Sequence, residues 1–280
     1  MRIDAHTHAM DADVDPVSRL PVPPVRAAWN DGDDPALQIE YARSYGIEKA
    51  LLLDLPEITF YLHKVFGDFI VPVPNVDSDN TTPEDIQKFF DRGAEGIKFI
   101  APKYSYGDDR YFPLYGAVYE NRGLSIFHTG FIGFNCFRVG GLFGRDHEPD
   151  ISLMTPSAVD RVARAFPNLK ILMSHFGNPA WEEAWKIMSS HKNVYSDFSG
   201  GTAAKRDFSI WRTIFMPNGI RDDKAIAKLC FATDGGAITP KCYDDNAVIR
   251  FYDWFYDEMN LSSEVRERID RGNILEMLNY

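Results

Sequence analysis

The stretch RIDAHTH, residues 2–8, is the first of eight short β-rich runs that recur along the whole chain. Most of the runs are nearly continuous in Val, Ile, Leu and Phe, which is typical of parallel strands buried on both faces. The seven that follow are KALLLD (49–54), FIVPVPNV (69–76), AEGIKFI (94–100), LSIFHTG (124–130), LKILMSHF (169–176), NVYSDFSG (193–200) and LCFATDGG (229–236).

Helical patterns separate these runs, and several begin at a recognisable cap, such as the Thr-Pro-acidic sequence TTPED at 81–85. Eight strand-then-helix units in 280 residues predict an α/β fold of the (β/α)₈ TIM-barrel type, in one domain spanning 1–280. A doubly wound sheet is the alternative, although no glycine-rich dinucleotide motif follows the first strand. The expected helices span 35–46, 57–66, 83–92, 113–122, 155–165, 180–190, 203–228 in pieces, and 243–259, with one or two short helices after them.

His6 and His8 lie in the first predicted strand. Residues i and i+2 of a strand face the same side, so both imidazoles project toward one point. Seven histidines in this chain give about 0.15 pairs at this spacing by chance, so the pair alone is only suggestive.

Other polar side chains stand at matching places in the predicted barrel. Catalytic residues of such barrels come from the carboxyl ends of several strands. Imidazoles with one carboxylate suit Zn²⁺ or a similar divalent ion, and a catalytic site leaves one coordination position open. A histidine that simply packs in the core is the usual explanation for any single histidine at a strand end. Four histidines at strand ends favour a metal-binding or catalytic site. The residues at these ends are His6, His8, Lys98, His128, His175 and Asp234.

The ordered motifs HxH, GIKF, FHTG, SHFG and FATDGG make the chain similar to the amidohydrolase superfamily. In particular the chain resembles the amidohydrolase-related branch that includes enzymes of the aminocarboxymuconate-semialdehyde decarboxylase type. The resemblance runs from residue 2 to about residue 236. It implies metal ligation by His6, His8, His128 and Asp234. It also implies an acid/base role for Asp234. For His175 it implies an acid/base or water-orienting role in single-metal members and metal ligation in two-metal members.

Lys98 is the position at which the resemblance leaves the metal count open. In two-metal relatives a lysine here is carboxylated and bridges the ions, whereas in many single-metal relatives the position contacts substrate. We expect one divalent ion, zinc with manganese or iron as alternatives, and an ammonium of Lys98 that faces the pocket. A second metal with carboxylated Lys98 is the alternative.

Two long connections, 9–34 and 131–154, are expected to lie over the site as binding loops. Arg145 in the second is a candidate for clamping a substrate carboxylate, with a solvated charged loop as the alternative. Asp197 and Ser199 either hydrogen-bond a ligand imidazole or cap a strand end. Asp4 is expected to support the site rather than to act in catalysis.

Composition narrows the classes of partner. The net charge of −11 argues against nucleic acid and anionic membranes, which leaves a small-molecule substrate. The three scattered cysteines and the lack of a leader or apolar span predict a cytoplasmic protein. The aromatic run FYDWFY (251–256) predicts core packing or a subunit contact, so a homodimer is a further expectation.

These observations predict a metal-dependent hydrolase. Its substrate is expected to be a small carboxylate-bearing amide, ester or lactone, attacked by a metal-activated water. The alternative is a non-oxidative, metal-dependent decarboxylase of a small carboxylic acid. A catalytically inactive metal-binding barrel is a third hypothesis, disfavoured because the chain keeps every element of the constellation.

Overall fold

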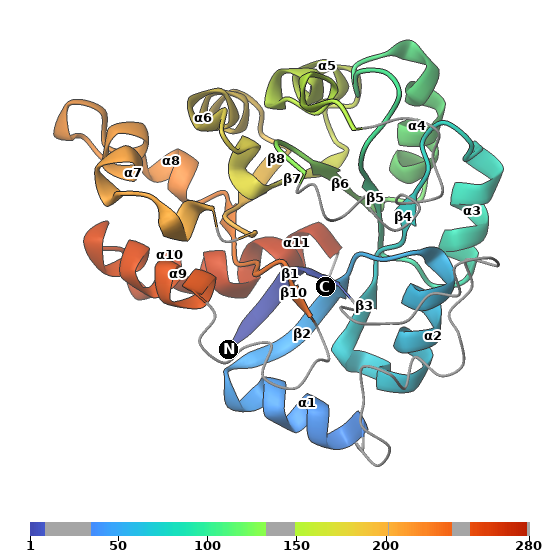
Figure 1. Cartoon of the computed structure of the whole chain (residues 1–280), viewed down its shortest axis with the longest axis horizontal. Helices are drawn as coiled ribbons and strands as arrows, with labels where there is room; N and C mark the ends of the chain where they lie inside the picture. Colours follow the sequence, from blue (N-terminus) through green and yellow to red (C-terminus); the bar gives the residue numbers. More distant parts are fainter. Residues whose placement is uncertain (9–34, 133–148, 201, 237–246, 279–280) are drawn as a thin grey trace.

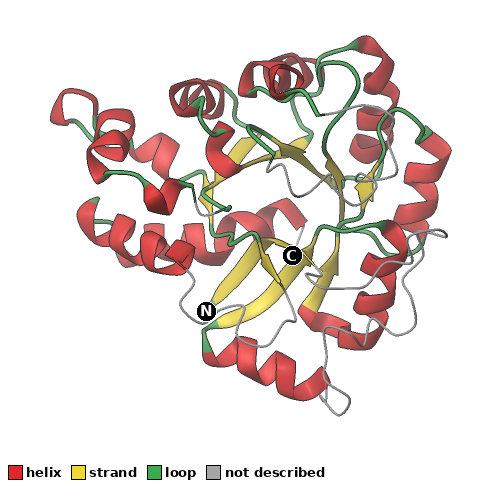
Figure 2. Cartoon of the chain, viewed as in Figure 1, coloured by secondary structure: helices red, strands yellow, loops and turns green. Residues whose placement is uncertain are grey.

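The computed structural model describes residues 1–8, 35–132, 149–200, 202–236 and 247–278. Within these residues, no helix combines the length and apolar character that crossing a membrane requires. Strands surround the centre of the molecule, and helices lie outside them (Figure 2). The arrangement confirms the predicted α/β barrel and excludes the doubly wound alternative.

All described strand pairs are parallel, and the strands follow chain order around the barrel in two sheets. The first sheet has the order β10-β1-β2-β3 and the second the order β4-β5-β6-β7-β8-β9 (Figure 1). The bounds are β1 Arg2–His8, β2 Ile47–Leu52, β3 Ile70–Pro72, β4 Asn75–Val76, β5 Gly96–Phe99, β6 Leu124–His128, β7 Lys170–Ser174, β8 Val194–Asp197, β9 Leu229–Cys230 and β10 Gly235–Gly236.

The two sheets meet at the third and eighth barrel positions, where two predicted strands are each divided. The run 69–76 becomes β3 and β4, and the run 229–236 becomes β9 and β10. Pro74 lies in the first interruption and has no N–H to donate to a ladder. Main-chain hydrogen bonds still cross both places, from Lys98 N to Pro74 O (3.0 Å) and from Ala5 N to Phe231 O (3.0 Å). The strand ladders are thus divided into two sheets, although single hydrogen bonds still connect neighbouring strands at both interruptions.

The helices lie close to the predicted ranges. Thr82 caps α3 through a reciprocal capping box with Asp85, and Thr155 caps α5, as their sequences indicate. The range 203–228 divides into α7, α8 and short turns. The bounds are α1 Pro35–Ser44, α2 Pro56–Phe66, α3 Pro83–Asp91, α4 Phe112–Glu120, α5 Pro156–Ala165, α6 Trp181–Ser190, α7 Phe208–Phe215, α8 Asp223–Ile226, α9 Ala247–Glu258, α10 Ser263–Glu267 and α11 Asn273–Leu278.

The apolar core has two parts. The larger part lies between the strands and the surrounding helices. The smaller part contains residues of the strands together with Ile274, Met277 and Leu278 of α11. The side chain of Asn273 donates to the carbonyls of Ala227 and Leu229, which places α11 at the amino ends of the strands. The opposite end of the barrel is left for polar side chains.

The aromatic run in α9 is mostly core. Phe251, Tyr252, Phe255 and Tyr256 are buried, as the core-packing interpretation predicts. Trp254 is 41% exposed, and its ring lies 4.3 Å from that of Phe208. A contact between two copies of the chain stays a prediction.

Candidate metal centre

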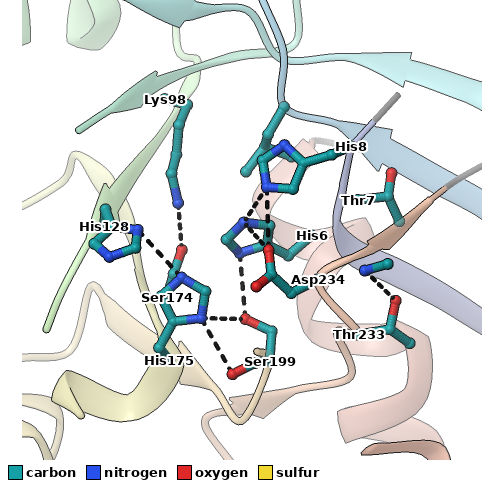
Figure 3. Close-up of polar contacts among 12 residues, drawn as sticks. His6, Thr7, His8, Lys98, His128, Ser174, His175, Ser199, Thr233 and Asp234 are labelled. Atoms are coloured by element: carbon teal, nitrogen blue, oxygen red, sulfur yellow. Dashed lines mark hydrogen bonds and ion pairs between the residues drawn. The ribbon is translucent and has the colours of Figure 1, made fainter. Parts of the chain in front are cut away.

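Three predicted ligands converge at the carboxyl end of the barrel. The Nε2 atoms of His6 and His8 lie 3.1 Å apart. Oδ1 of Asp234 lies 3.2 Å from Nε2 of His6 and 3.1 Å from Nε2 of His8 (Figure 3). His6 is buried, whereas the side chains of His8 and Asp234 keep 30% and 28% of their exposure. His8 and Asp234 are thus partly buried.

The backbone of strands β1 and β10 brings these atoms together. His6 and His8 face the same side because they are two residues apart in β1. Asp234 directly precedes β10, and its N–H donates to the carbonyl of His6 at 2.8 Å. Asp4 accepts from the N–H and the hydroxyl of Thr233, at 3.0 and 2.6 Å, which fixes the segment before Asp234. This supporting role of Asp4 agrees with the expectation.

The geometry of the three atoms fits a divalent cation. Two ligand atoms on one tetrahedral Zn²⁺, at about 2.0–2.2 Å from the ion, lie roughly 3.3–3.5 Å apart. The three observed separations of 3.1–3.2 Å are close to this value. Two imidazole nitrogens and one carboxylate oxygen are also a donor set that Zn²⁺ accepts. His6, His8 and Asp234 therefore could hold such an ion.

His128 and His175 form a second pair beside this cluster. Nδ1 of His128 lies 3.2 Å from Nε2 of His175, and the ring of His175 lies 4.9 Å from that of His6. His128 ends β6, and His175 follows β7 (Figure 3). Nε2 of His128 is buried and has no hydrogen-bond partner among the described residues. The ring of His175 thus lies between His128, a predicted ligand, and the other three predicted ligands.

His175 and Asp234 share an uncommon backbone conformation. Their φ angles are +64° and +61°, in the left-handed region that few residues other than glycine adopt. Gly200, at φ +85°, packs between them: a Cβ there would lie 3.0 Å from Nδ1 of His175 and 3.2 Å from Oδ2 of Asp234. Such strain concentrates at functional sites.

Lys98 of β5 reaches into the same region beside the histidines. Its side chain is fully buried, and Nζ donates to Oγ of Ser174 at 2.7 Å (Figure 3). Burial lowers the pKa of Lys98 to about 7 despite the charges of Asp197 and Asp234. Ser174 was not among the predicted site residues, because only the register of β5, β6 and β7 brings it to Lys98.

Ser199 connects the two groups of histidines. Its Oγ lies 3.3 Å from Nδ1 of His6 and 2.9 Å from Nδ1 of His175. The same Oγ donates to Oδ1 of Asp197 at 2.5 Å. Ligand atoms of His6, His175 and Asp197 also lie close enough to hold a cation, but in this structure each of the three residues contacts the Ser199 hydroxyl. Of the two interpretations, contact with imidazoles fits Ser199, whereas Asp197 accepts the main-chain N–H groups of His175 and Ser199 after the strand end.

Charge and burial set the protonation of the cluster. Burial opposes the charged form of Asp234, but its hydrogen bond with His8 and nearby cations hold its pKa below the usual value. Burial also opposes protonation of His8, yet Asp234 raises the pKa of His8 overall. Burial, with the charge of Lys98, lowers the pKa of His6 far below its usual value. At neutral pH, Asp234 is therefore a carboxylate and His6 a neutral imidazole.

Arg145 lies outside the described residues, as do most of the two long connections that are expected over the site. Its role in binding a substrate carboxylate stays a prediction.

The fold and the cluster define an α/β-barrel protein with a His/Asp centre at the carboxyl ends of its strands. The amidohydrolase family model matches residues 3–279, so the chain belongs to the amidohydrolase family. This confirms the resemblance seen in the sequence motifs. No curated protein matches the sequence.

Solved structures share the fold over nearly the whole chain. An amidohydrolase from Burkholderia multivorans with bound zinc has a TM-score of 0.63 at 13% identity, covering 100% of this chain and 99% of its own. A 5-carboxyvanillate decarboxylase from Sphingomonas paucimobilis has a TM-score of 0.62 at 11% identity, covering 99% and 98%. A dihydroxybenzoic acid decarboxylase from Polaromonas sp. JS666 with bound manganese has a TM-score of 0.59 at 15% identity, covering 99% and 96%. At these identities the likeness establishes the fold.

Proposed function

We propose that the protein is a metal-dependent hydrolase of small carboxylate-bearing amides, esters or lactones. The observation that carries the proposal is the carboxylate of Asp234, with Oδ1 at 3.1–3.2 Å from the Nε2 atoms of both β1 histidines. A divalent cation held by these atoms would polarise a carbonyl and acidify a water molecule. The family and the donor set support this cation, with zinc first and manganese or iron as alternatives.

Asp234 and His175 are proposed to move the protons of the reaction. The lowered pKa of Asp234 keeps its carboxylate ready to accept a proton from the attacking water. Burial also lowers the pKa of His175, although the charge of Asp234 opposes this effect, so His175 is a neutral imidazole that can accept a proton in turn. Both groups are thus proton acceptors, which suits activation of water.

The substrate's acid group is assigned to Lys98 and Arg145. Among the residues that the structure describes, Nζ of Lys98 donates to the hydroxyl of Ser174, and an ammonium can donate three hydrogen bonds. A substrate carboxylate beside Lys98 would favour the ammonium form. Arg145 remains proposed from the sequence alone.

Decarboxylation is the second candidate function. Two of the solved structures with this fold carry the names of decarboxylases of aromatic acids. That reaction needs a proton donor for the carbon that loses CO₂, and Lys98 with a pKa of about 7 is one. The same constellation could therefore serve either reaction, and the product decides between them.

The test is product analysis with zinc- or manganese-loaded protein in H₂¹⁸O. A panel of carboxylate-bearing amides, esters, lactones and aromatic acids is followed by mass spectrometry and by CO₂ detection. Hydrolysis incorporates ¹⁸O into a new carboxyl group without CO₂ release. Release of CO₂ without incorporation identifies the decarboxylase instead. No turnover of any compound by protein with bound metal would contradict both proposals and favour the inactive barrel.

A further inference from the structure

The hydroxyl of Ser199 touches two imidazoles that belong to different parts of the centre. It lies 3.3 Å from Nδ1 of His6 on β1 and 2.9 Å from Nδ1 of His175 after β7 (Figure 3). Its third contact is Oδ1 of Asp197, at 2.5 Å. Ser199 and Asp197 are 3% and 0% exposed, so water does not compete for these contacts.

The direction of each hydrogen bond follows from Asp197. Its Oδ1 already accepts the main-chain N–H of His175 at 3.0 Å and that of Ser199 at 2.9 Å, so this oxygen carries no proton. The Ser199 hydroxyl must therefore donate its only proton to Asp197. The two lone pairs of Oγ then remain to accept N–H groups. The contacts with His6 and His175 are thus Nδ1–H donors to Oγ.

This assignment of the Nδ1 protons determines which of the other ring nitrogens carry a lone pair. When Nδ1 of a neutral imidazole carries the proton, Nε2 carries the lone pair. Nε2 of His6 then offers a lone pair beside His8 and Asp234. Nε2 of His175 accepts from Nδ1–H of His128, which leaves the lone pair of His128 on its unpartnered Nε2.

We propose that Ser199 is a positioning residue whose hydroxyl, oriented by Asp197, fixes the Nδ1–H tautomer of His6 and shares this role at His175 with the main-chain carbonyl of Ser199. Through His6 it presents an Nε2 lone pair to the metal centre, and through His175 it leaves Nε2 to accept from His128. The inference rests on the proposed function in one respect, namely that His6 binds the cation.

The two histidines depend on this hydroxyl to different degrees. Nδ1 of His175 also lies 3.1 Å from the main-chain carbonyl of Ser199, which no side-chain substitution removes. For Nδ1 of His6, the Ser199 hydroxyl is the partner that the described residues provide. Loss of the hydroxyl should therefore affect His6 far more than His175.

The experiment compares Ser199→Ala with Ser196→Ala. Ser196 is a matched control because it is a buried serine of β8, three residues before Ser199, and donates to the carbonyl of Met173. Zinc affinity is measured by competition with a chromophoric chelator. Loss of a group that orients a metal-binding histidine typically costs 10- to 100-fold in affinity. We expect such a loss in Ser199→Ala and a change of less than about threefold in Ser196→Ala.

A second measurement reads the tautomers directly and has its deciding result in the wild-type protein. Long-range ¹H–¹⁵N spectra of the zinc-loaded wild-type protein report which ring nitrogen carries the proton. We expect the proton on Nδ1 of both His6 and His175, and on Nδ1 of His175 in Ser199→Ala as well. A proton on Nε2 of either ring in the wild-type protein would overturn the proposal.

The outcomes separate the two proposals. A wild-type protein that binds no zinc contradicts the proposed function. If Ser199→Ala binds zinc as tightly as the wild-type protein does, the role of Ser199 is contradicted and the proposed function still stands.

Discussion

At the scale of single residues, the carboxylate of Asp234 is the group on which the proposed chemistry depends most. Asparagine keeps its size and tolerates the φ of +61° better than most residues, so Asp234→Asn should fold normally. It cannot accept a proton, and we expect turnover to fall by about 10²–10⁴-fold. Steady-state kinetics and thermal unfolding check the two statements. Activity near that of the wild-type protein would refute the assignment.

Lys98 should link stability to pH. Its pKa falls from 10.5 to about 7 on folding because burial disfavours the ammonium. The unfolded chain therefore binds more protons between these values, so the unfavourable contribution of Lys98 is fully present below pH 7 and shrinks as pH rises.

Replacing Lys98 by Met removes this dependence. The stability of Lys98→Met minus that of the wild-type protein should be larger at pH 6 than at pH 9, by roughly 2–3 kcal/mol. Urea unfolding of chelator-treated proteins at both pH values measures the difference. An equal difference at both pH values would show that Lys98 is not held in a desolvated site.

At the scale of elements, Gly130 lies where the chain after β6 packs closely against the turn after β7. Its φ is +112°, and a Cβ would lie 2.2 Å from the carbonyl oxygen of Asn178. Gly130→Ala should destabilise the protein by at least about 2 kcal/mol, because a clash adds to backbone strain. Gly46→Ala, with φ +79° and open space around it, should cost only about 1 kcal/mol. Denaturant unfolding compares the two, and equal losses would argue against the close approach.

The strands could be predicted because parallel strands that are buried on both faces are apolar throughout. The site residues could be predicted because the carboxyl ends of such strands meet at one end of the barrel. The interruptions at Pro74 and before β10 were not predicted, since apolar runs do not show where a ladder breaks. The contact of Lys98 with Ser174 depends on the relative register of three strands. The link through Ser199 depends on side-chain directions, so the sequence left two interpretations of it open.

At the scale of the whole molecule, the metal centre joins segments that are distant in the chain. Its converging atoms come from β1 and from the residue before β10. A cation that binds only the folded chain stabilises it, by about 2.7 kcal/mol at a free concentration of 100 times Kd. For a chain of this length the melting temperature should rise by roughly 5–10 °C.

Calorimetry with and without zinc checks this rise. The double substitution His6→Ala and His8→Ala should abolish it. His63→Ala is the matched control, since His63 contacts the carbonyl of Ile70 away from the centre and should leave the rise intact. A rise that survives the double substitution would place the cation elsewhere.

The packing of α11 bears on how the chain folds during synthesis. Ile274, Met277 and Leu278 complete the interior cluster, yet ribosomes translate them after every strand that they cover. A nascent chain that carries all the strands but not yet this helix exposes the floor of its barrel to the cell's other proteins. Chaperones that shield apolar surface should therefore matter most between synthesis of the last strand and docking of this helix.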